Sequence, residues 1–266
     1  MAEEEGKYIY CLIGANEERK FGPVGIGGRG DEVYTVCYRD IAAVISDSPT
    51  LKFPVDRPNI MAHQQVMEEV MKRHVILPVK FDTIAESKRK RGTVIETHEE
   101  RIKREVLQKR YDEFEDLLVE MSDKIELGVR GLWTDRDKIL GEIVKENQEI
   151  ALLNKLILKR PPTRTQAERV KLGEMVMKAL DEKKAREEDR VVRVLKRIAV
   201  DFRQNKKTGD KMFMNDAFLV ETSREPEFDN ALNELNRDYD ERWKIKFIGP
   251  VPPCNFVEIV VTWEED

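Results

Sequence analysis

A long stretch without strand pattern limits how this chain can fold. Over residues 135–202 the sequence is highly charged, and its apolar residues recur at three- and four-residue steps, which is the period of a helix. The parts before and after this stretch alternate short β-branched or aromatic runs with amphipathic runs. The pattern therefore predicts a helical segment set between two regions of mixed α and β structure.

The first third is predicted to form antiparallel strands covered by helices. Strand patterns occur at KYIYCLI, EVYTVCY and IAAVIS, and their direct succession favours antiparallel pairing. A helix is predicted at residues 58–74, a strand at 75–81, a helix at about 94–121 and a strand at 125–133. Pro78 indicates a sheet edge or a bulge, because proline has no N–H for the ladder. The order predicts a ferredoxin-like α+β arrangement.

The last third returns to mixed structure and completes a second unit. Strand patterns at AFLVETS, WKIKFIG and FVEIVVTW flank a helical pattern at EPEFDNALNELNRDY. Pro161 and Pro162 end one helix of the central segment, and the pattern beyond them fits either one bent helix or two. We expect two α+β domains, 1–121 and 122–266, each an antiparallel sheet with helices packed on one face. The second is enlarged by inserted helices at about 135–203.

Composition disfavours several classes of protein. Charged residues make up 37% of the chain, but 47 basic and 52 acidic residues leave a formal charge of -5, which disfavours a nucleic-acid-binding protein. Cys11, Cys37 and Cys254 are odd in number and lie in apolar runs, which indicates buried free thiols in a reducing cytoplasm. The acidic start is unlike a signal peptide, and no run of about 18 apolar residues occurs, so we expect neither export nor a membrane span.

A glycine-rich stretch, VGIGGRG, matches the spacing of a dinucleotide-binding loop. Gly25, Gly27 and Gly30 stand at the G-x-G-x-x-G positions, but such a loop needs a helix at its last glycine so that free N–H groups meet the pyrophosphate. The next residues, DEVYTVCY, have the pattern of a strand. We therefore favour a connection between two strands, in which glycines supply positive φ angles, over a nucleotide-binding loop.

Patterns typical of catalysis or metal binding are sparse. No two of His63, His74 and His98 have the i, i+4 spacing that places a zinc pair on one helix face. His63 lies beside an apolar helix face, which favours a packed or hydrogen-bonded residue over a catalytic one. The phosphate loop of P-loop proteins and the G-x-S-x-G nucleophile elbow are missing from the sequence. We expect no enzyme activity, no cofactor and no metal.

Two runs of charge have a solvated and a functional interpretation. SKRKRG, with Lys88, Arg89, Lys90 and Arg91, can bind a phosphate backbone or an acidic partner, but we favour a solvated loop before a helix. The run DEKKAREEDR mixes signs at helical spacing and predicts exposed ion pairs. Neither run by itself identifies a site.

Several motifs, in order along the chain, resemble one known family. MAHQQVMEEVM followed by VILPVKFDTI is similar to the AH-x-x-V-x-E helix and the LP-x-x-FGT strand of the gas vesicle proteins GvpF and GvpL, and GPVPPCNFVEI is similar to their GP-x-PP-x-F tail. RDIAAVISDSP and NDAFLVETSREPEFDNALNEL resemble the family's third strand and its late strand and helix. The likeness therefore covers nearly the whole chain. Asp82 stands where the family usually has glycine, and Cys254 where it commonly has an aromatic residue.

The resemblance implies a two-domain accessory protein of gas vesicles that is not an enzyme. It implies a protein in the cytoplasm, in or on the vesicle, that binds the small hydrophobic shell protein GvpA and assists its assembly. Neither nucleic acid nor a membrane is expected as a partner. Two alternatives stay open: a scaffold that binds other gas vesicle accessory proteins through the charged helices of residues 135–202, and a nucleotide-binding regulator that uses residues 24–30.

We place the partner surface in the first domain, at the strand 75–81, with the tail near residues 251–256. The predicted contact residues are Leu77, Pro78, Val79, Phe81, Pro250, Pro252, Pro253 and Phe256. An exposed sheet edge or apolar surface is what a shell protein that is insoluble alone requires of a soluble carrier. The prolines also fit a purely conformational role, in which Pro252 and Pro253 stiffen the approach to the last strand and Pro78 marks a bulge.

Overall fold

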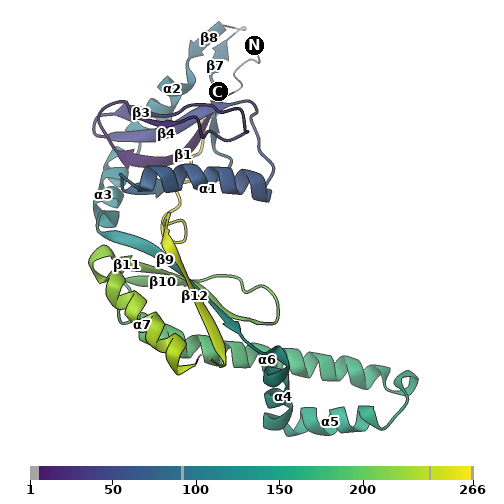
Figure 1. The fold of residues 1–266 in the computed structure, drawn as a ribbon. Coiled ribbons are helices and arrows are strands. Elements are labelled where there is room, and N and C mark those ends of the chain that lie inside the picture. Colours follow the sequence, from purple (N-terminus) through teal and green to yellow (C-terminus); the bar gives the residue numbers. More distant parts are fainter. Residues whose placement is uncertain (1–5, 91–92, 240, 265–266) are drawn as a thin grey trace. The chain divides into compact units, whose positions relative to one another are not determined.

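The computed structural model describes residues 6–90, 93–239 and 241–264, and it divides into two compact units (Figure 1). Unit 1 comprises Met1–Glu126 and Pro250–Asp266, and unit 2 comprises Leu127–Gly249. Each unit has its own antiparallel sheet with helices, so the predicted α+β class is confirmed. Unit 1 also includes residues 250–266, whereas the sequence pattern predicted that everything after residue 121 belongs to the second domain. Where the independently folding domains begin and end stays a prediction.

The sheet of unit 1 has the strand order β2-β3-β4-β1-β5, with β6 also paired to β1. Its strands are β1 (Gly6–Gly14), β2 (Lys20–Gly22), β3 (Val33–Tyr38), β4 (Ile41–Ser48), β5 (Ile76–Pro78) and β6 (Ile84–Ala85). β1 is antiparallel to β4, β5 and β6, and β3 is antiparallel to β2 and β4. This pairing agrees with the prediction from strand patterns in direct succession.

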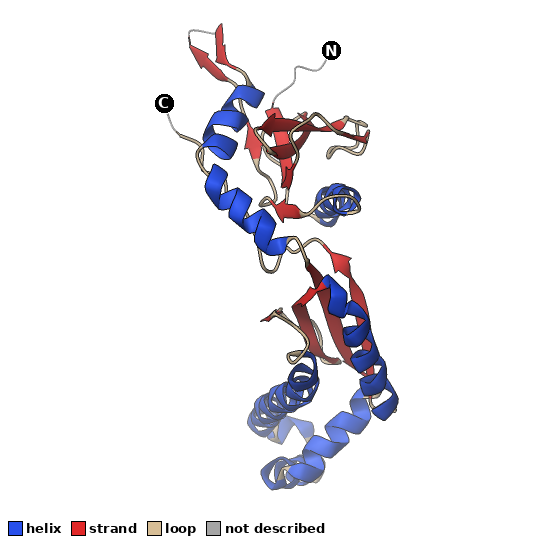
Figure 2. Ribbon diagram, turned by 90° about the vertical axis from the view of Figure 1, so that its left-hand side faces the viewer, coloured by secondary structure: helices blue, strands red, loops and turns tan. Residues whose placement is uncertain are grey.

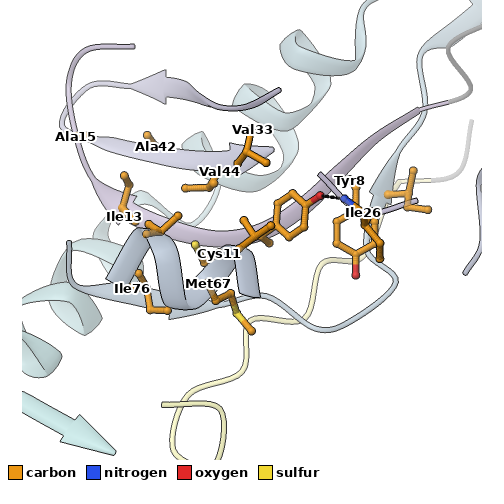
Figure 3. Close-up of a cluster of buried hydrophobic side chains, with 14 of the residues drawn as sticks. Tyr8, Cys11, Ile13, Ala15, Ile26, Val33, Ala42, Val44, Met67 and Ile76 are labelled. Carbon is orange, nitrogen blue, oxygen red and sulfur yellow. Dashed lines mark hydrogen bonds between the residues drawn. The ribbon is translucent and has the colours of Figure 1, made fainter. Parts of the chain in front are cut away.

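Both faces of this sheet are covered by helices. Eight consecutive residues of β1, 6–13, are buried, which requires cover on each side of the strand. Helix α1 (Arg57–Met71) packs on one face, where Met67 lies among side chains of β1 and β4 (Figure 3). The π-helix η1 (Ile102–Gln108) and helix α3 (Tyr111–Met121) contact β3, β4 and β1 with a separate buried set. The sequence predicted helices on one face only.

The helix predicted at residues 94–121 begins later than expected. Two short strands, β7 (Lys88–Lys90) and β8 (Thr93–Glu96), form a hairpin there, and helix α2 (His98–Arg101) then leads into η1. The Thr97 side chain accepts from the Glu100 N–H, and the Glu100 carboxylate accepts from the Thr97 N–H, so a capping box fixes the helix start. The prediction of a solvated loop at SKRKRG was therefore wrong, because residues 88–90 form a strand. Arg91 lies outside the described residues.

Unit 2 is a four-stranded sheet with the order β10-β11-β9-β12 and a group of long helices (Figures 1 and 2). Its strands are β9 (Lys124–Trp133), β10 (Asp201–Gln204), β11 (Met212–Glu221) and β12 (Trp243–Val251). Its helices are α4 (Arg136–Glu146), α5 (Gln148–Leu158), α6 (Gln166–Leu195) and α7 (Glu225–Asp238). The segment after Pro162 is thus one helix from residue 166 to 195, and α6 packs against β11 and α7.

The strand predicted at FVEIVVTW is missing from the described structure, and that prediction was wrong. Residues 256–263 form an irregular segment with one bridge, between Val79 and Ile259. The three cysteines are free thiols, but only Cys11 is buried, while Cys37 is half-buried and Cys254 is exposed. In the described ranges, no helix combines the length and the apolar character needed to cross a membrane.

Candidate partner-binding site

Four of the predicted contact residues lie in or directly after β5. Leu77 and Pro78 are buried, and Val79 is 2% exposed. Phe81 is half-buried, and its ring centroid lies 5.7 Å from that of His63. These side chains pack inside unit 1, so they offer little surface for contact with another protein.

The outer edge of β5 is covered by the chain's own C-terminal segment. The Ile259 N–H donates to the Pro78 carbonyl at 2.8 Å, and the Lys80 N–H donates to the Ile259 carbonyl at 3.0 Å. These bonds form the parallel bridge between Val79 and Ile259, and Ile259 is only 3% exposed. The residue that meets the strand is thus Ile259, which lies beyond the predicted contact residues 250–256, so the predicted contact surface stays a prediction.

The neighbouring sequence stops this bridge from lengthening in either direction. One step back, a parallel ladder needs a donor at residue 78, and Pro78 has no N–H. One step forward, it needs the Lys80 carbonyl, which accepts from the Thr83 hydroxyl at 2.6 Å, and the next bond needs the Asp82 N–H, which donates to the Tyr8 hydroxyl at 3.0 Å. A segment rich in β-branched residues therefore remains irregular, because its pairing edge offers hydrogen bonds for only one residue.

The start of the tail is held by a buried carboxylate. Pro252 and Pro253 are buried, Phe256 is half-buried and Pro250 is exposed. Beside them, the Glu126 carboxylate accepts from the Asn255 N–H at 2.9 Å and from the Asn255 side-chain amide at 2.6 Å. Glu126 is 3% exposed, and burial raises the pKa of its carboxyl group. Two charge-assisted bonds in a buried setting make Asn255 a firm anchor.

The distal part of the tail lies against basic side chains of α2, η1 and the residues before α3. The Arg110 guanidinium donates to the Val260 carbonyl at 2.9 Å. The Arg101 guanidinium lies 4.8 Å from the ring centroid of Trp263, within cation–π range. In the two views of Figures 1 and 2, the segment leading to the C-terminus runs beside α2.

The last described residue, Glu264, has both a backbone and a side-chain anchor. Its N–H donates to the Glu105 carboxylate at 3.2 Å, and its side chain pairs with Lys109 and, at 3.6 Å, with Arg104. The side chain of Glu105 is fully buried and also lies 2.8 Å from Arg104. Sequence reasoning did not select Glu105, although a carboxylate on the same helix face as Ile102 is a readable signal of a buried, paired charge.

His63 is a packed core residue, as the sequence favoured. Its Nδ1 lies 3.1 Å from the Tyr8 hydroxyl, and its ring stacks on that of Tyr10 with centroids 5.8 Å apart. Burial lowers the pKa of His63 to about 4, so the imidazole is neutral at neutral pH. It also shares a hydrogen bond with the backbone of Val79, which ties α1 to the residue that bridges the tail.

The glycine-rich stretch is a connection between strands, as favoured. Residues 24–30 lie between β2 and β3, and β3 begins at Val33 without an intervening helix. Gly27, Gly28 and Gly30 have φ values of 95°, 71° and 76°, which a residue with a side chain rarely adopts. The Ile26 N–H donates inward to the Tyr10 hydroxyl at 2.8 Å. The helix that a dinucleotide loop requires is missing from this part of the described chain.

Unit 2 carries its charges in paired networks. Arg242 donates to Glu142 at 2.9 and 3.0 Å and to Glu187 at 2.6 Å, and its bonds to Glu142 lower the pKa of that carboxyl group to about 2. Lys183 and Glu188, like Glu187, are at most 5% exposed, so the prediction of exposed ion pairs in DEKKAREEDR was wrong for these three residues. In the part of the chain that the structure describes, no cluster of His, Cys, Asp or Glu could hold a metal ion.

Comparison with known proteins gives consistent matches over nearly the full length. The family model described as gas vesicle synthesis protein GvpL/GvpF matches residues 6–258. The chain is 24% identical to gas vesicle protein F1 of Halobacterium salinarum, over 98% of this chain and 97% of that protein. It is 27% identical to gas vesicle protein F of a Streptomyces species, over 94% of this chain and 99% of that protein. The crystal structure of GvpF from Anabaena sp. PCC7120 matches with a TM-score of 0.70 at 19% identity, over 96% of this chain and 99% of that structure's chain.

Proposed function

Since the chain belongs to the GvpL/GvpF family of gas vesicle synthesis proteins, we propose that it is an accessory protein that binds the shell protein GvpA and assists vesicle assembly. The match to the family model over residues 6–258 carries this proposal. We place the protein in the cytoplasm at the vesicle and assign it no catalytic role. The packing of His63 supports the absence of a catalytic role, because the neighbours of this neutral imidazole are aromatic rings and a tyrosine hydroxyl rather than a nucleophile.

We infer that unit 1 supplies the contact surface for the shell protein. The strand 75–81 and residues 250–256 both belong to unit 1, and the outer edge of β5 is a backbone edge that an extended segment can pair with, as Ile259 of the same chain does. Unit 1 also displays apolar side chains at the start of α1 and in the loop before it. Among these, Val55 is 80% exposed and Met61 is 53% exposed. Exposed apolar area of this kind competes with the self-association of a hydrophobic shell subunit.

A second candidate is a scaffold for other gas vesicle accessory proteins. Helices α5 and α6 of unit 2 favour it, because Leu152, Leu158 and Val170 are 67%, 76% and 60% exposed. Exposed apolar residues on two adjacent helices are typical of a helical docking surface. The two candidates therefore assign different units to binding.

Two methionines of similar exposure separate these candidates. Met61 on α1 is 53% exposed and Met177 on α6 is 56% exposed, so M61K and M177K make the same chemical change on the two units. The experiment is capture of GvpA, and in parallel of the other accessory proteins, by the tagged full-length chain. We expect GvpA capture to be lost with M61K and kept with M177K. Failure of the folded wild-type chain to capture GvpA would refute the shell-binding role.

A further inference from the structure

The tail, residues 257–264, occupies a surface of unit 1 that is able to hold an extended chain. The residues of this tail-docking surface are Pro78, Lys80, Arg101, Arg104, Lys109 and Arg110. Pro78 and Lys80 bond to the backbone of one tail residue, and Arg110 bonds to the carbonyl of the next. Backbone recognition of this kind is largely independent of the side chains that the bound segment carries.

The side-chain contacts define which segments fit this surface. Ile259 supplies a buried apolar side chain at the bridge, Trp263 lies over Arg101 four residues later, and Glu264 pairs with Lys109 and Arg104 one residue after that. The surface thus favours an extended segment with an apolar residue followed by an aromatic and an acidic residue.

The tail is attached by two bonds to one buried group at its start and by separate, single backbone contacts beyond it. Asn255 is bonded twice to the buried Glu126, whereas the later contacts are the bridge at Ile259, the bond from Arg110 to the Val260 carbonyl and the bond from the Glu264 N–H to Glu105. The side chain of Glu264 is 58% exposed and those of Lys109 and Arg104 are each 41% exposed. Ion pairs with this exposure contribute little to stability. Residues 257–264 can therefore detach while Asn255 stays bound.

We propose that the tail is a tethered substitute for a partner, and that an extended segment of the shell protein displaces residues 257–264 from the tail-docking surface. The identity of the partner rests on the function proposed above. In the free protein, the tail covers a sheet edge that would otherwise pair with unrelated chains. Its high effective concentration, on the order of mM for a short tether, excludes weak ligands and admits one that contacts more of the surface.

Hydrogen exchange on the wild-type chain tests displacement directly. The Ile259 N–H belongs to the tail, and the Lys80 N–H belongs to the surface that the incoming segment would occupy. On addition of saturating GvpA, we expect Ile259 to lose protection from exchange while Lys80 keeps it. Binding of GvpA with unchanged exchange at Ile259 would overturn the proposal and leave the shell-binding function standing.

A matched pair of charge reversals provides the second test. E264K places a cation against Lys109 and Arg104, whereas E258K makes the same charge change at an exposed tail residue outside the contacts described above. Since loosening the tail removes a competitor, we expect E264K to bind GvpA about two- to five-fold more tightly and E258K to bind it unchanged. Equal or weaker binding by E264K would contradict the proposal.

A peptide experiment keeps the proposal testable if GvpA is not the partner. The probe is a labelled peptide with the sequence of residues 255–264, added to the full-length chain. We expect it to bind E264K several-fold more tightly than E258K, and to lose binding when its isoleucine is replaced by aspartate. No binding to either variant would show that the surface does not accept a segment in trans, and would overturn the proposal whatever GvpA does.

Discussion

Asp82 has an unfavourable backbone conformation, and its side chain makes a hydrogen bond that compensates for it. Its φ of 66° lies in the left-handed region, which is otherwise seen outside glycine only at Arg39 among the described residues. Aspartate tolerates this conformation better than most residues. Its carboxylate accepts from the Phe53 N–H at 2.7 Å, a bond that the glycine typical of the resembled family cannot make.

Substitutions at Asp82 should separate the backbone effect from the hydrogen bond. D82A loses the bond to Phe53 and places a β-carbon in the left-handed region, so we expect a loss of about 2 kcal/mol in the free energy of unfolding. D82G loses only the bond, and we expect a loss of about 1 kcal/mol or less. Urea denaturation measures both values. Equal losses for the two variants would mean that the backbone conformation costs nothing here.

Asp216 in unit 2 is expected to make stability depend on pH. It is 2% exposed, and burial together with the neighbouring Glu188 carboxylate raises its pKa to about 7, with Lys207 opposing this effect. The folded-state pKa lies above that of an unfolded aspartate, near about 3.9. The favourable contribution of the protonated group is therefore complete in acid and is lost as the pH rises from about 4 to about 7.

Replacing this residue by asparagine should flatten that pH profile. We expect D216N to stabilise unit 2 relative to wild type at about pH 8, by on the order of 2 kcal/mol, and to have little effect near about pH 4. D229N, at an exposed position of α7, is the control and should leave the profile unchanged. Thermal unfolding followed across this pH range measures the effect. A D216N profile parallel to that of wild type would rule out titration of Asp216 as its cause.

At the scale of elements, sequence patterns within a single segment predicted helices and strands better than features that depend on contacts with distant segments. The strand patterns of β1 and β9 and the amphipathic pattern of α1 were sufficient because each is complete within its own segment. The start of α2 was also readable, since Thr97 and Glu100 have the spacing of a capping box. The irregular tail could not be foreseen, because Pro78 and the bond between Asp82 and Tyr8 block its pairing from a distant part of the chain.

Restoring a donor at residue 78 should lengthen the pairing between β5 and the tail. P78V supplies an N–H for the carbonyl of Val257 and keeps an apolar side chain of similar size. The new bond contributes about 1 kcal/mol, and the loss of proline's restraint on the unfolded chain offsets most of it, so we expect little change in Tm. Hydrogen exchange should instead show that the new N–H at residue 78 is protected. Fast exchange there would mean that something other than the missing donor limits the bridge.

At the scale of the whole molecule, unit 2 is a continuous segment placed between two parts of unit 1. The segment Leu127–Gly249 contains most of its four-stranded sheet and all of α4 to α7. Unit 1, by contrast, needs both Met1–Glu126 and Pro250–Asp266. The family motifs follow this arrangement, since the helix and strand motifs near residue 80 and the tail motif near residue 255 belong to the same unit. A boundary drawn at residue 121 would therefore separate the tail from the sheet edge that it covers.

This arrangement predicts complementation between fragments. A fragment of residues 1–126 should be stabilised by a peptide of residues 250–266 added in trans, by about 2.7 kcal/mol at 100 times the dissociation constant. A peptide with N255A keeps the backbone bond to Glu126 but loses the bond from the side-chain amide to this buried carboxylate, so it should bind about 10- to 100-fold more weakly. Thermal shift and titration of the fragment measure both effects. If the fragment melts at the same temperature with and without saturating peptide, the tail is not part of the folding unit formed by residues 1–126.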